Sequence, residues 1–437
     1  MSLWLKYWFN IGSFFETMQP NIRVLKLFGL FPYTISHVRA PPDPARSHQN
    51  AVTGCNRSSK MLKSEVKFMD VVVFTLWQTF FLQMLYASWP KMFFDIPVSR
   101  IITMVTLILY LLAGFNCSAS STLVLLFRKK FMRMVQLVEE ADRLFVRYFH
   151  EIDHPKLHLV CVALLLGSFF CQGLLLLNDV TAGQNLVNTS LITQDMAKLA
   201  VTSYYYIVRT AHVTCVTAFI SGLFGFRERF LAFNRHLRVC FLERTSAEHT
   251  PSFSKMMCQI QGFTVIYSNL CDAIQAFCTI FVWQPMMFCA SVIVTSVFSI
   301  LTIGHVLTDP STIVLSLARI HAAVAIFYTF IFLLLVKLGS DLKREGKQTA
   351  VLVHKAINQS SKTPALVERL VLFSHHLQHQ RPVVSCGLFS FDWTLALSII
   401  SALATYSVIL IQFELGVPKF FISAILQQNA EMSATNP

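Results

Sequence analysis

The stretch TYSVILIQF, residues 405–413, ends the last of seven apolar segments that are each long enough to cross a membrane. A helix that spans a bilayer needs about 20 mostly apolar residues. The segments, whose boundaries are soft by several residues, are 70–86, 101–127, 158–178, 201–226, 280–303, 312–336 and 387–413. The sequence therefore predicts an all-α polytopic membrane protein with seven transmembrane helices.

The composition agrees with a protein of the lipid bilayer. Of the 437 residues, 54% are hydrophobic and only 14% are charged, and the mean hydropathy is +0.55. The net charge of +13 could suggest binding to nucleic acid. However, the basic residues lie between the apolar segments, and no basic tract is interleaved with aromatic residues, as a nucleic-acid surface would require. We therefore expect no nucleic-acid partner.

The basic residues also predict the orientation of the chain. Counted in order along the eight segments that flank the spans, Lys and Arg number 9, 2, 7, 1, 6, 0, 8 and 1. Loops rich in Lys and Arg stay in the cytoplasm. The alternation therefore predicts a cytoplasmic N-terminus and an extracellular C-terminus, the reverse of a G-protein-coupled receptor.

This topology divides the chain into three parts. Residues 1–69 form a cytoplasmic N-terminal segment with a flexible Pro-rich linker at 39–60, residues 70–413 form the seven-helix domain, and residues 414–437 form an extracellular tail. The first 18 residues have no long apolar core for a signal peptide. Two interpretations of them remain open, an aromatic amphipathic helix on the inner membrane surface and a loosely ordered tail.

The inner segments are long and amphipathic. Within 128–157, apolar residues recur at helical spacing at Met132, Val135, Val138, Leu144 and Phe145. We expect the spans to continue as helices into the cytoplasm. Their apolar faces must pack against something outside the bilayer, and packing against copies of the chain would form a cytoplasmic assembly domain.

The predicted outer loops are short and hold few chemical features. None of the 11 Cys falls in an outer loop, so no extracellular disulfide is indicated. The sequon Asn188-Thr189-Ser190 does fall there, which makes Asn188 a candidate glycosylation site.

Polar residues in the outer halves of two spans are candidates for ligand binding. Arg209 and His212 lie about one turn apart and follow a Tyr run that includes Tyr205, while Arg319 and His321 lie in the sixth span. Ionisable side chains are costly in hydrocarbon and commonly functional there. Facing each other, these clusters would line an outward-open pocket for a small polar or amphipathic ligand. The alternative is an interfacial Tyr belt, with the Arg side chains in helix–helix contacts.

The last span has the features of a pore helix. Gln412 is a polar residue at the outer end of an apolar helix, with Ile409 and Val408 on its face. Several copies around an axis would place rings of Gln412 and Phe413 at a constriction, and Glu414 would favour cations at the outer mouth. The alternative is a lipid-facing helix with Gln412 at the interface.

Enzymatic features are weak. His375, His376 and His379 could bind a metal ion, but a solvated basic helix explains them better. No nucleophile–base–acid set or phosphate loop is present, so we expect neither a metal nor a cofactor nor an enzyme. Pro285 after Trp283 predicts a helix kink, and Asp392 predicts a structural anchor before the last span.

The string Thr405-Tyr406, five residues, Gln412-Phe413 resembles the C-terminal signature of insect gustatory receptors. The apolar string at 28–32 (FGLFP) and the stretch at 386–392 (CGLFSFD) are similar to further strings of that family.

The resemblance implies a seven-span receptor that forms a tetrameric ligand-gated cation channel in the plasma membrane of a chemosensory neuron. It implies that the last helix lines the pore, that Gln412 and Phe413 shape the gate, and that a small tastant opens it, in a homo- or hetero-tetramer. Sugar-sensing members tend to carry Glu after the Thr-Tyr pair, whereas this chain has Ser407. A bitter or unassigned tastant is therefore favoured over a sugar.

Three alternatives remain. An insect odorant receptor subunit would have the same architecture. A metabotropic seven-helix receptor would need the opposite orientation, and the chain lacks its N-P-x-x-Y and D-R-Y strings. A membrane oxygenase would need more His clusters than the one at His375.

Overall fold

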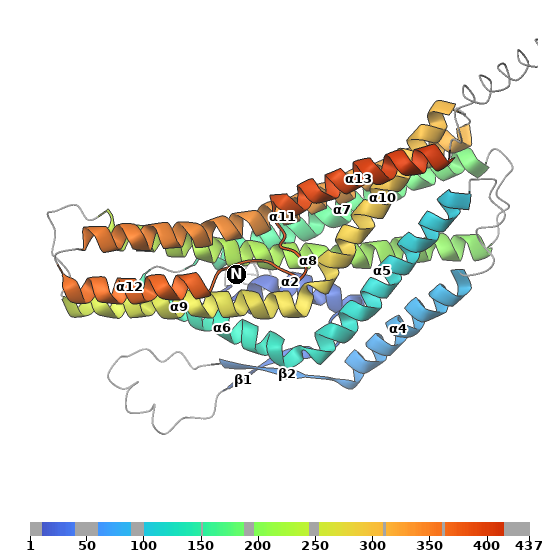
Figure 1. The fold of residues 1–437 in the computed structure, drawn as a ribbon. Coiled ribbons are helices and arrows are strands. Elements are labelled where there is room, and N and C mark those ends of the chain that lie inside the picture. Colours follow the sequence, from blue (N-terminus) through green and yellow to red (C-terminus); the bar gives the residue numbers. More distant parts are fainter. Residues whose placement is uncertain are drawn as a thin grey trace, which may run out of the picture.

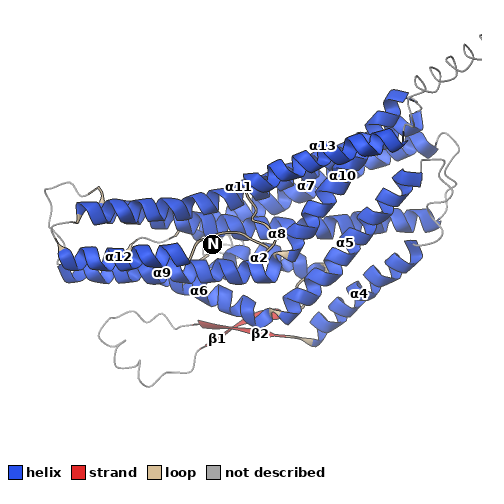
Figure 2. Ribbon diagram, in the orientation of Figure 1, coloured by secondary structure: helices blue, strands red, loops and turns tan. Residues whose placement is uncertain are grey.

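The structure is a computed structural model that describes residues 11–39, 60–88, 100–149, 152–187, 196–243, 253–308, 312–360 and 363–414. These residues form an elongated bundle of helices (Figure 1). One small two-stranded sheet lies beside the bundle (Figure 2). The fold is therefore nearly all helical, as the sequence predicts.

Each of the seven predicted spans falls on a helix. These helices are α4 (Phe68–Ser88), α5 (Arg100–Leu126), α7 (His154–Val187), α8 (Met196–Phe241), α10 (Trp283–Thr308), α11 (Thr312–Gln359) and α13 (Trp393–Glu414). The remaining helices are α2 (Phe14–Leu27), α6 (Arg128–Tyr148), α9 (Phe253–Phe281) and α12 (Pro364–His379). The last span begins later than predicted, because residues before Asp392 form a turn and not helix.

Within the described residues, six helices are long and apolar enough to cross a membrane, or up to seven if a bent pair counts as one span. That pair is the end of α5 and the whole of α6, which meet at an angle of 70°. The six include α9, which the sequence analysis places in an inner segment. The described part of α4 is a shorter apolar helix.

Two helices run through both halves of the bundle. With 46 and 48 residues, α8 and α11 are each about 70 Å long at 1.5 Å per residue, whereas the hydrocarbon core measures about 30 Å. In Figure 1 their distal parts lie beside α6, α9 and α12 in one half of the molecule. The expectation that spans continue as helices beyond the bilayer is confirmed for α8 and α11.

The amphipathic face of α6 is buried within the same chain. Met132, Val135, Val138 and Phe145 are buried and Leu144 is half-buried, and α6 packs mainly against α9. The predicted apolar face is therefore confirmed. The prediction that this face packs against a second copy of the chain is not needed to explain its burial, because α9 of the same chain covers it.

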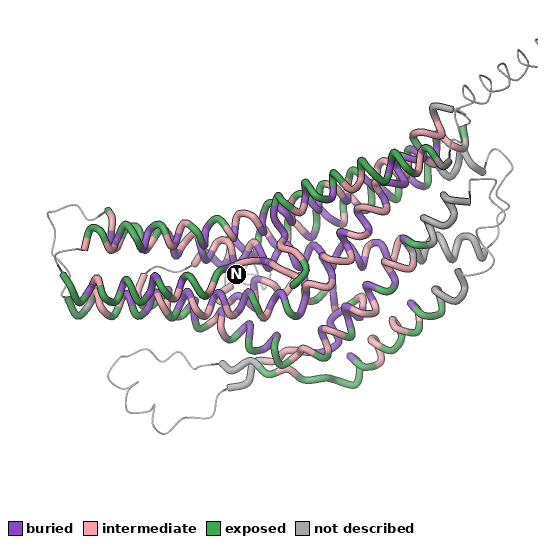
Figure 3. Tube along the Cα trace, in the orientation of Figure 1, coloured by how far each residue is buried: buried purple, intermediate pink, exposed green. Residues whose placement is uncertain are grey.

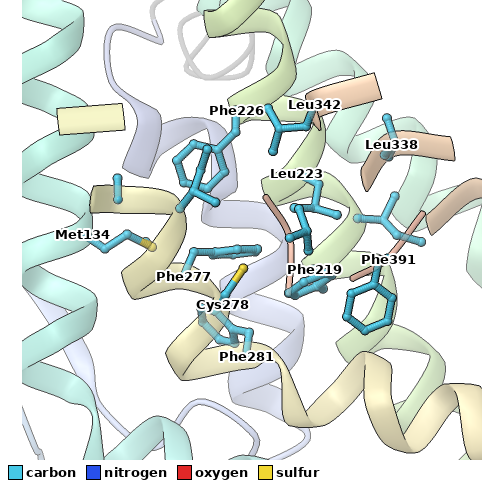
Figure 4. Packing of buried hydrophobic residues seen from close by; sticks show 14 of the residues in the cluster. Met134, Phe219, Leu223, Phe226, Phe277, Cys278, Phe281, Leu338, Leu342 and Phe391 are labelled. Carbon is cyan, nitrogen blue, oxygen red and sulfur yellow. The ribbon is translucent and has the colours of Figure 1, made fainter. Parts of the chain in front are cut away.

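The core between the helices is rich in phenylalanine. Phe277 of α9 stacks on Phe219 of α8 at 4.9 Å and meets Phe226 edge-on at 5.5 Å, as Figure 4 shows. Such ring pairs add about 0.5–1.5 kcal/mol each beyond the burial of their area. Helix α8 lies at the centre, since 83% of its most apolar window is buried.

Helix α2 packs one face against the helix bundle. Phe14 is 2% exposed and packs on Phe226 at 5.9 Å, with the Arg229 guanidinium 4.8 Å from the Phe14 ring centre. Of the first 18 residues, 14–18 belong to this helix and 1–10 lie outside the described part, so the two interpretations of that stretch stay predictions. After α2 the chain turns at Gly29, whose positive φ of 65° suits glycine.

The two strands were not expected from the sequence. β1 (Thr34–Arg39) pairs antiparallel with β2 (Lys60–Glu65), so that Thr34 lies opposite Glu65. The predicted linker lies between them and is mostly outside the described residues. The strands lack a regular alternation of apolar and polar residues, the signal by which strands are recognised, so this pairing could not be foreseen.

Helix α9 ends at Phe281 and α10 begins at Trp283, two residues before Pro285. Proline fits the first turn of a helix, because its missing N–H would have no intrahelical partner there. The kink predicted at this proline is confirmed as a break between two helices.

Candidate functional site

The last helix is held at its start by Asp392. Oδ1 accepts the Thr394 backbone N–H at 3.1 Å, and Oδ2 accepts Lys343 Nζ at 2.7 Å and the Ser390 hydroxyl at 2.8 Å. The hydrogen bond from Lys343 is the main cause that lowers the pKa of Asp392 to about 2. The carboxylate thus caps α13 and ties it to α11, so the predicted anchor is confirmed.

Helix α13 buries only a narrow stripe. Ala396, Ile399 and Ser407 are buried at helical spacing, and the helix packs on α10 and α11. Only 17% of its most apolar window is buried, and Figure 3 shows exposed residues along its length. Most of the surface of α13 is therefore available to lipid or to other subunits.

Most of the predicted pore residues lie on this open surface, and the side chains of the other two are not described. The exposed residues are Thr405, Tyr406, Val408, Ile409 and Gln412. The side chains of Phe413 and Glu414 lie outside the described part, although both residues belong to the helix. A single chain cannot test a pore that copies would form, so the pore residues stay a prediction.

Arg209 lies in a buried polar cluster between α7 and α8. Its side chain is 1% exposed; Nε donates to Gln172 Oε1 at 3.1 Å and Nη1 to Asp179 Oδ2 at 3.2 Å. The Tyr206 hydroxyl donates to the same Asp179 oxygen at 2.8 Å. Asp179 and Gln172 were not predicted as partners of Arg209, although a carboxylate at the end of a span is a signal for a basic partner.

His212 lies one turn further along α8 and faces different helices. Its side chain is buried, and its Nδ1 lies 2.6 Å from Asn116 Nδ2 on α5. The rings of Phe288 and Tyr328 lie 5.6 Å and 6.5 Å away. His212 is thus a buried polar side chain that lies beside two aromatic rings.

The second cluster on α11 is placed differently. Arg319 is exposed and donates to the Thr181 hydroxyl on α7 at 3.2 Å. His321 packs edge-on against Phe298 of α10 at 4.1 Å. The four described candidates therefore do not converge on one another: Arg209 and Arg319 both contact α7, His212 lies among α5, α10 and α11, and His321 contacts α10. The side chain of Tyr205 lies outside the described part.

The remaining predicted sites are peripheral. His375 and His379 are exposed on α12 and His376 is half-buried. Among the described residues, no group of three His, Cys, Asp or Glu side chains is arranged to hold a metal ion. Asn188 and residues 415–437 lie outside the described part, so the glycosylation site and the tail stay predictions.

Residues 18–416 match the family model of the 7tm Chemosensory receptor. "Putative gustatory receptor 28a" of Drosophila melanogaster is 37% identical over 89 residues, and the match spans only 20% of the length of each protein.

Solved structures share the fold. The insect olfactory receptor OR5 from Machilis hrabei superposes with a TM-score of 0.59 at 11% identity, over 91% of this chain and 98% of that one. The same receptor in complex with eugenol gives a TM-score of 0.54 at 12% identity, with the same coverage. At such low identity the likeness shows the fold alone.

Proposed function

Because the chain belongs to the 7tm Chemosensory receptor family, we propose that it is a gustatory receptor that acts as a ligand-gated non-selective cation channel. A small tastant opens it from an outward-facing pocket, and a bitter or unassigned tastant fits better than a sugar. The receptor acts in the plasma membrane of a chemosensory neuron. Four copies, alone or with other gustatory receptors, form the channel.

The open surface of α13 is the observation that carries this proposal. A helix that buries one stripe leaves the rest of its circumference for lipid or for a subunit contact. Its exposed end carries Gln412, which is polar, beside the apolar Val408 and Ile409. Rings of such residues around an axis can gate ions by dewetting.

The orientation in this proposal rests on the charge alternation. Helices α6, α9 and α12 lie in the same half of the bundle (Figure 1), and they belong to three of the four segments that are rich in Lys and Arg. This shared position supports a cytoplasmic location for that half. The N-terminus is then inside and the C-terminus outside.

The ligand pocket in this proposal lies beside Arg209 and His212. Both are buried polar groups of α8, and the rings of Phe288 and Tyr328 lie beside His212. Such a mixture suits a small molecule with an apolar body and a few polar atoms. Arg319 and His321 lie at the edge of this region on α11.

An odorant receptor subunit is the second candidate, favoured by the fold shared with OR5. Current from this chain expressed alone would count against an obligatory co-receptor. A metabotropic receptor is the third, and ligand-evoked current that persists when G proteins are blocked with GDPβS would oppose it.

The test is whole-cell recording of tastant-evoked current from the chain with Gln412→Ala. We expect altered gating or lost current, because the polar ring is removed from the constriction. Ser401→Ala, also exposed on α13 but three turns from Gln412, is the matched control and should keep wild-type current. Unchanged current in charge-bearing variants of Gln412, Phe413 and Glu414 would overturn the pore assignment.

A further inference from the structure

A patch of basic side chains lies where the chain enters the first predicted span and leaves the second. This basic patch consists of Lys67, directly before α4, and of Lys129, Lys130 and Arg133 in the first two turns of α6. All four side chains are exposed. Lys130 lies 4.9 Å from the ring centre of Phe127. Within the described residues, none of the four forms an ion pair with a carboxylate.

Contacts between the elements bring the two parts of the patch together. The Tyr33 ring packs edge-on against Phe131 of α6, with the ring centres 6.2 Å apart. The next residue, Thr34, donates its hydroxyl to Asp70 Oδ2 at 2.8 Å. The same oxygen accepts the Lys67 backbone N–H at 3.1 Å. Lys67 is therefore held near the start of α6, although α4 and α5 lie between them in the sequence.

The tendency of basic residues to stay inside explains that they are present, but not that they lack carboxylate partners. Basic side chains on the long helices α8 and α11 do have such partners. Arg227 Nε lies 3.3 Å from Asp341 Oδ2, and Lys343 Nζ lies 2.7 Å from Asp392 Oδ2. On α6, the first exposed carboxylate is Glu140, about 10 Å along the axis from the last residue of the patch. The described residues therefore do not neutralise the patch.

Exposed apolar side chains border the patch on its membrane side. Phe68 and Met69 begin α4 and are 80% and 65% exposed, and Leu126, at the end of α5, is 69% exposed. A phospholipid matches both parts of this surface, because its headgroup can meet the basic side chains and its acyl chains the apolar ones. A soluble phosphate compound would leave the apolar side chains in water.

The patch lies on the opposite side of the bundle from the predicted pore helix. In Figure 1 the small sheet and α4 lie along the lower edge of the molecule, whereas α13 lies along the upper edge. Helix α4 packs mainly against α5. An assembly built around α13 would therefore leave the patch open to the surrounding lipid.

We propose that the basic patch binds the headgroups of anionic phospholipids at the inner surface of the membrane, through Lys67, Lys129, Lys130 and Arg133. Clusters of about four to eight Lys and Arg residues next to a span are typical of such binding, and both side chains form charge-assisted hydrogen bonds to phosphate oxygens. The site is separate from the ligand pocket and from the pore. Only the leaflet that it faces rests on the proposed orientation.

The test is native mass spectrometry of the purified full chain in detergent micelles, titrated with dioleoylphosphatidylserine or with dioleoylphosphatidylcholine. The two lipids share their acyl chains, so the comparison isolates the net charge of the headgroup. One basic residue near an anionic lipid surface contributes about fivefold in affinity. We therefore expect the chain to bind the serine lipid more tightly than the choline lipid by at least about fivefold.

Variants assign this preference to the patch. The patch variant Lys129→Gln/Lys130→Gln/Arg133→Gln should bind the two lipids about equally, because uncharged side chains replace the basic ones. Lys67→Gln, in the other part of the patch, should lose part of the preference. This single change at an exposed position gives a second measurement even if the triple variant does not fold.

Arg235→Gln/Lys355→Gln/Arg369→Gln is the matched control. It removes the same charge from exposed residues of α8, α11 and α12 outside the patch, so it should keep the preference. Equal binding of both lipids by the wild type would overturn the proposal. A preference that survives in the patch variant, or that is lost to the same extent in the control, would also overturn it. None of these results depends on channel current, so the proposed function is tested separately.

Discussion

At the scale of single residues, buried charges carry the most specific information. Asp142 of α6 accepts Arg229 Nε at 2.8 Å and Nη2 at 2.6 Å, and both residues are buried. Such bidentate contacts between an arginine and a carboxylate are stronger than ion pairs with a single hydrogen bond. Their partners lie 87 residues apart in the chain. The pair therefore fixes α6 against α8 through a contact that no local pattern could reveal.

Removal of one partner should be destabilising. We expect Asp142→Ala to lower the free energy of unfolding by about 3–5 kcal/mol, because Arg229 keeps its buried charge without a counter-ion. Urea unfolding of the purified chain in micelles, followed by Trp fluorescence, measures this change.

The control is an exposed ion pair on the small sheet. Lys63 Nζ lies 3.3 Å from Glu65, and both side chains are well exposed. Glu65→Ala should therefore cost less than about 1 kcal/mol. Equal losses in Asp142→Ala and Glu65→Ala would contradict the role of burial.

At the scale of elements, α13 is positioned by the turn before it. Gly339 of α11 lies directly against the backbone carbonyl of Phe391, so close that a Cβ at position 339 could not fit without movement. Asp392 follows at once and binds Lys343, one turn further along α11. The start of the predicted pore helix is thus held by one close backbone approach and one ion pair.

Gly339→Ala should push this turn away from α11. We expect a loss of stability of about 1–3 kcal/mol, the usual cost of overpacking, together with altered gating if α13 forms the pore. Gly304→Ala in α10 is the control, because nothing lies within 4 Å of its added Cβ. That change should be neutral or stabilise by up to about 1 kcal/mol. Melting temperatures with and without tastant would separate the two variants, and a neutral Gly339→Ala would refute the close approach.

At the scale of the whole molecule, the orientation and the number of copies are the properties to test. Epitope tags at each terminus should be read in intact and in permeabilised cells. We expect the C-terminal tag to be labelled on intact cells and the N-terminal tag only after permeabilisation, because the charge alternation places the N-terminus inside. The reverse result would favour the metabotropic receptor over the channel.

Assembly can be checked on the same material. Mass photometry of the purified chain in micelles should give four copies if α13 and the half formed by α6, α9 and α12 meet their counterparts. A monomer alone would show that α13 faces lipid, the alternative that the sequence leaves open.

The amino-acid sequence by itself determined the seven apolar segments, the helical extensions beyond them and the amphipathic face of α6. These features depend on composition and on the helical period, which are local properties and can be recognised in a single sequence. The anchor role of Asp392 and the break at Pro285 follow from equally local rules on caps and on proline.

Only the tertiary structure decided which surfaces meet. The burial of α2, the pairing of β1 with β2, the partners of Arg209 and Arg229, and the basic patch beside α6 all join residues far apart in the chain. An arginine or a lysine looks the same in a sequence whether its partner is Asp179, water or a lipid headgroup. That choice depends on which helix faces lie against each other, and it arises only when the chain packs.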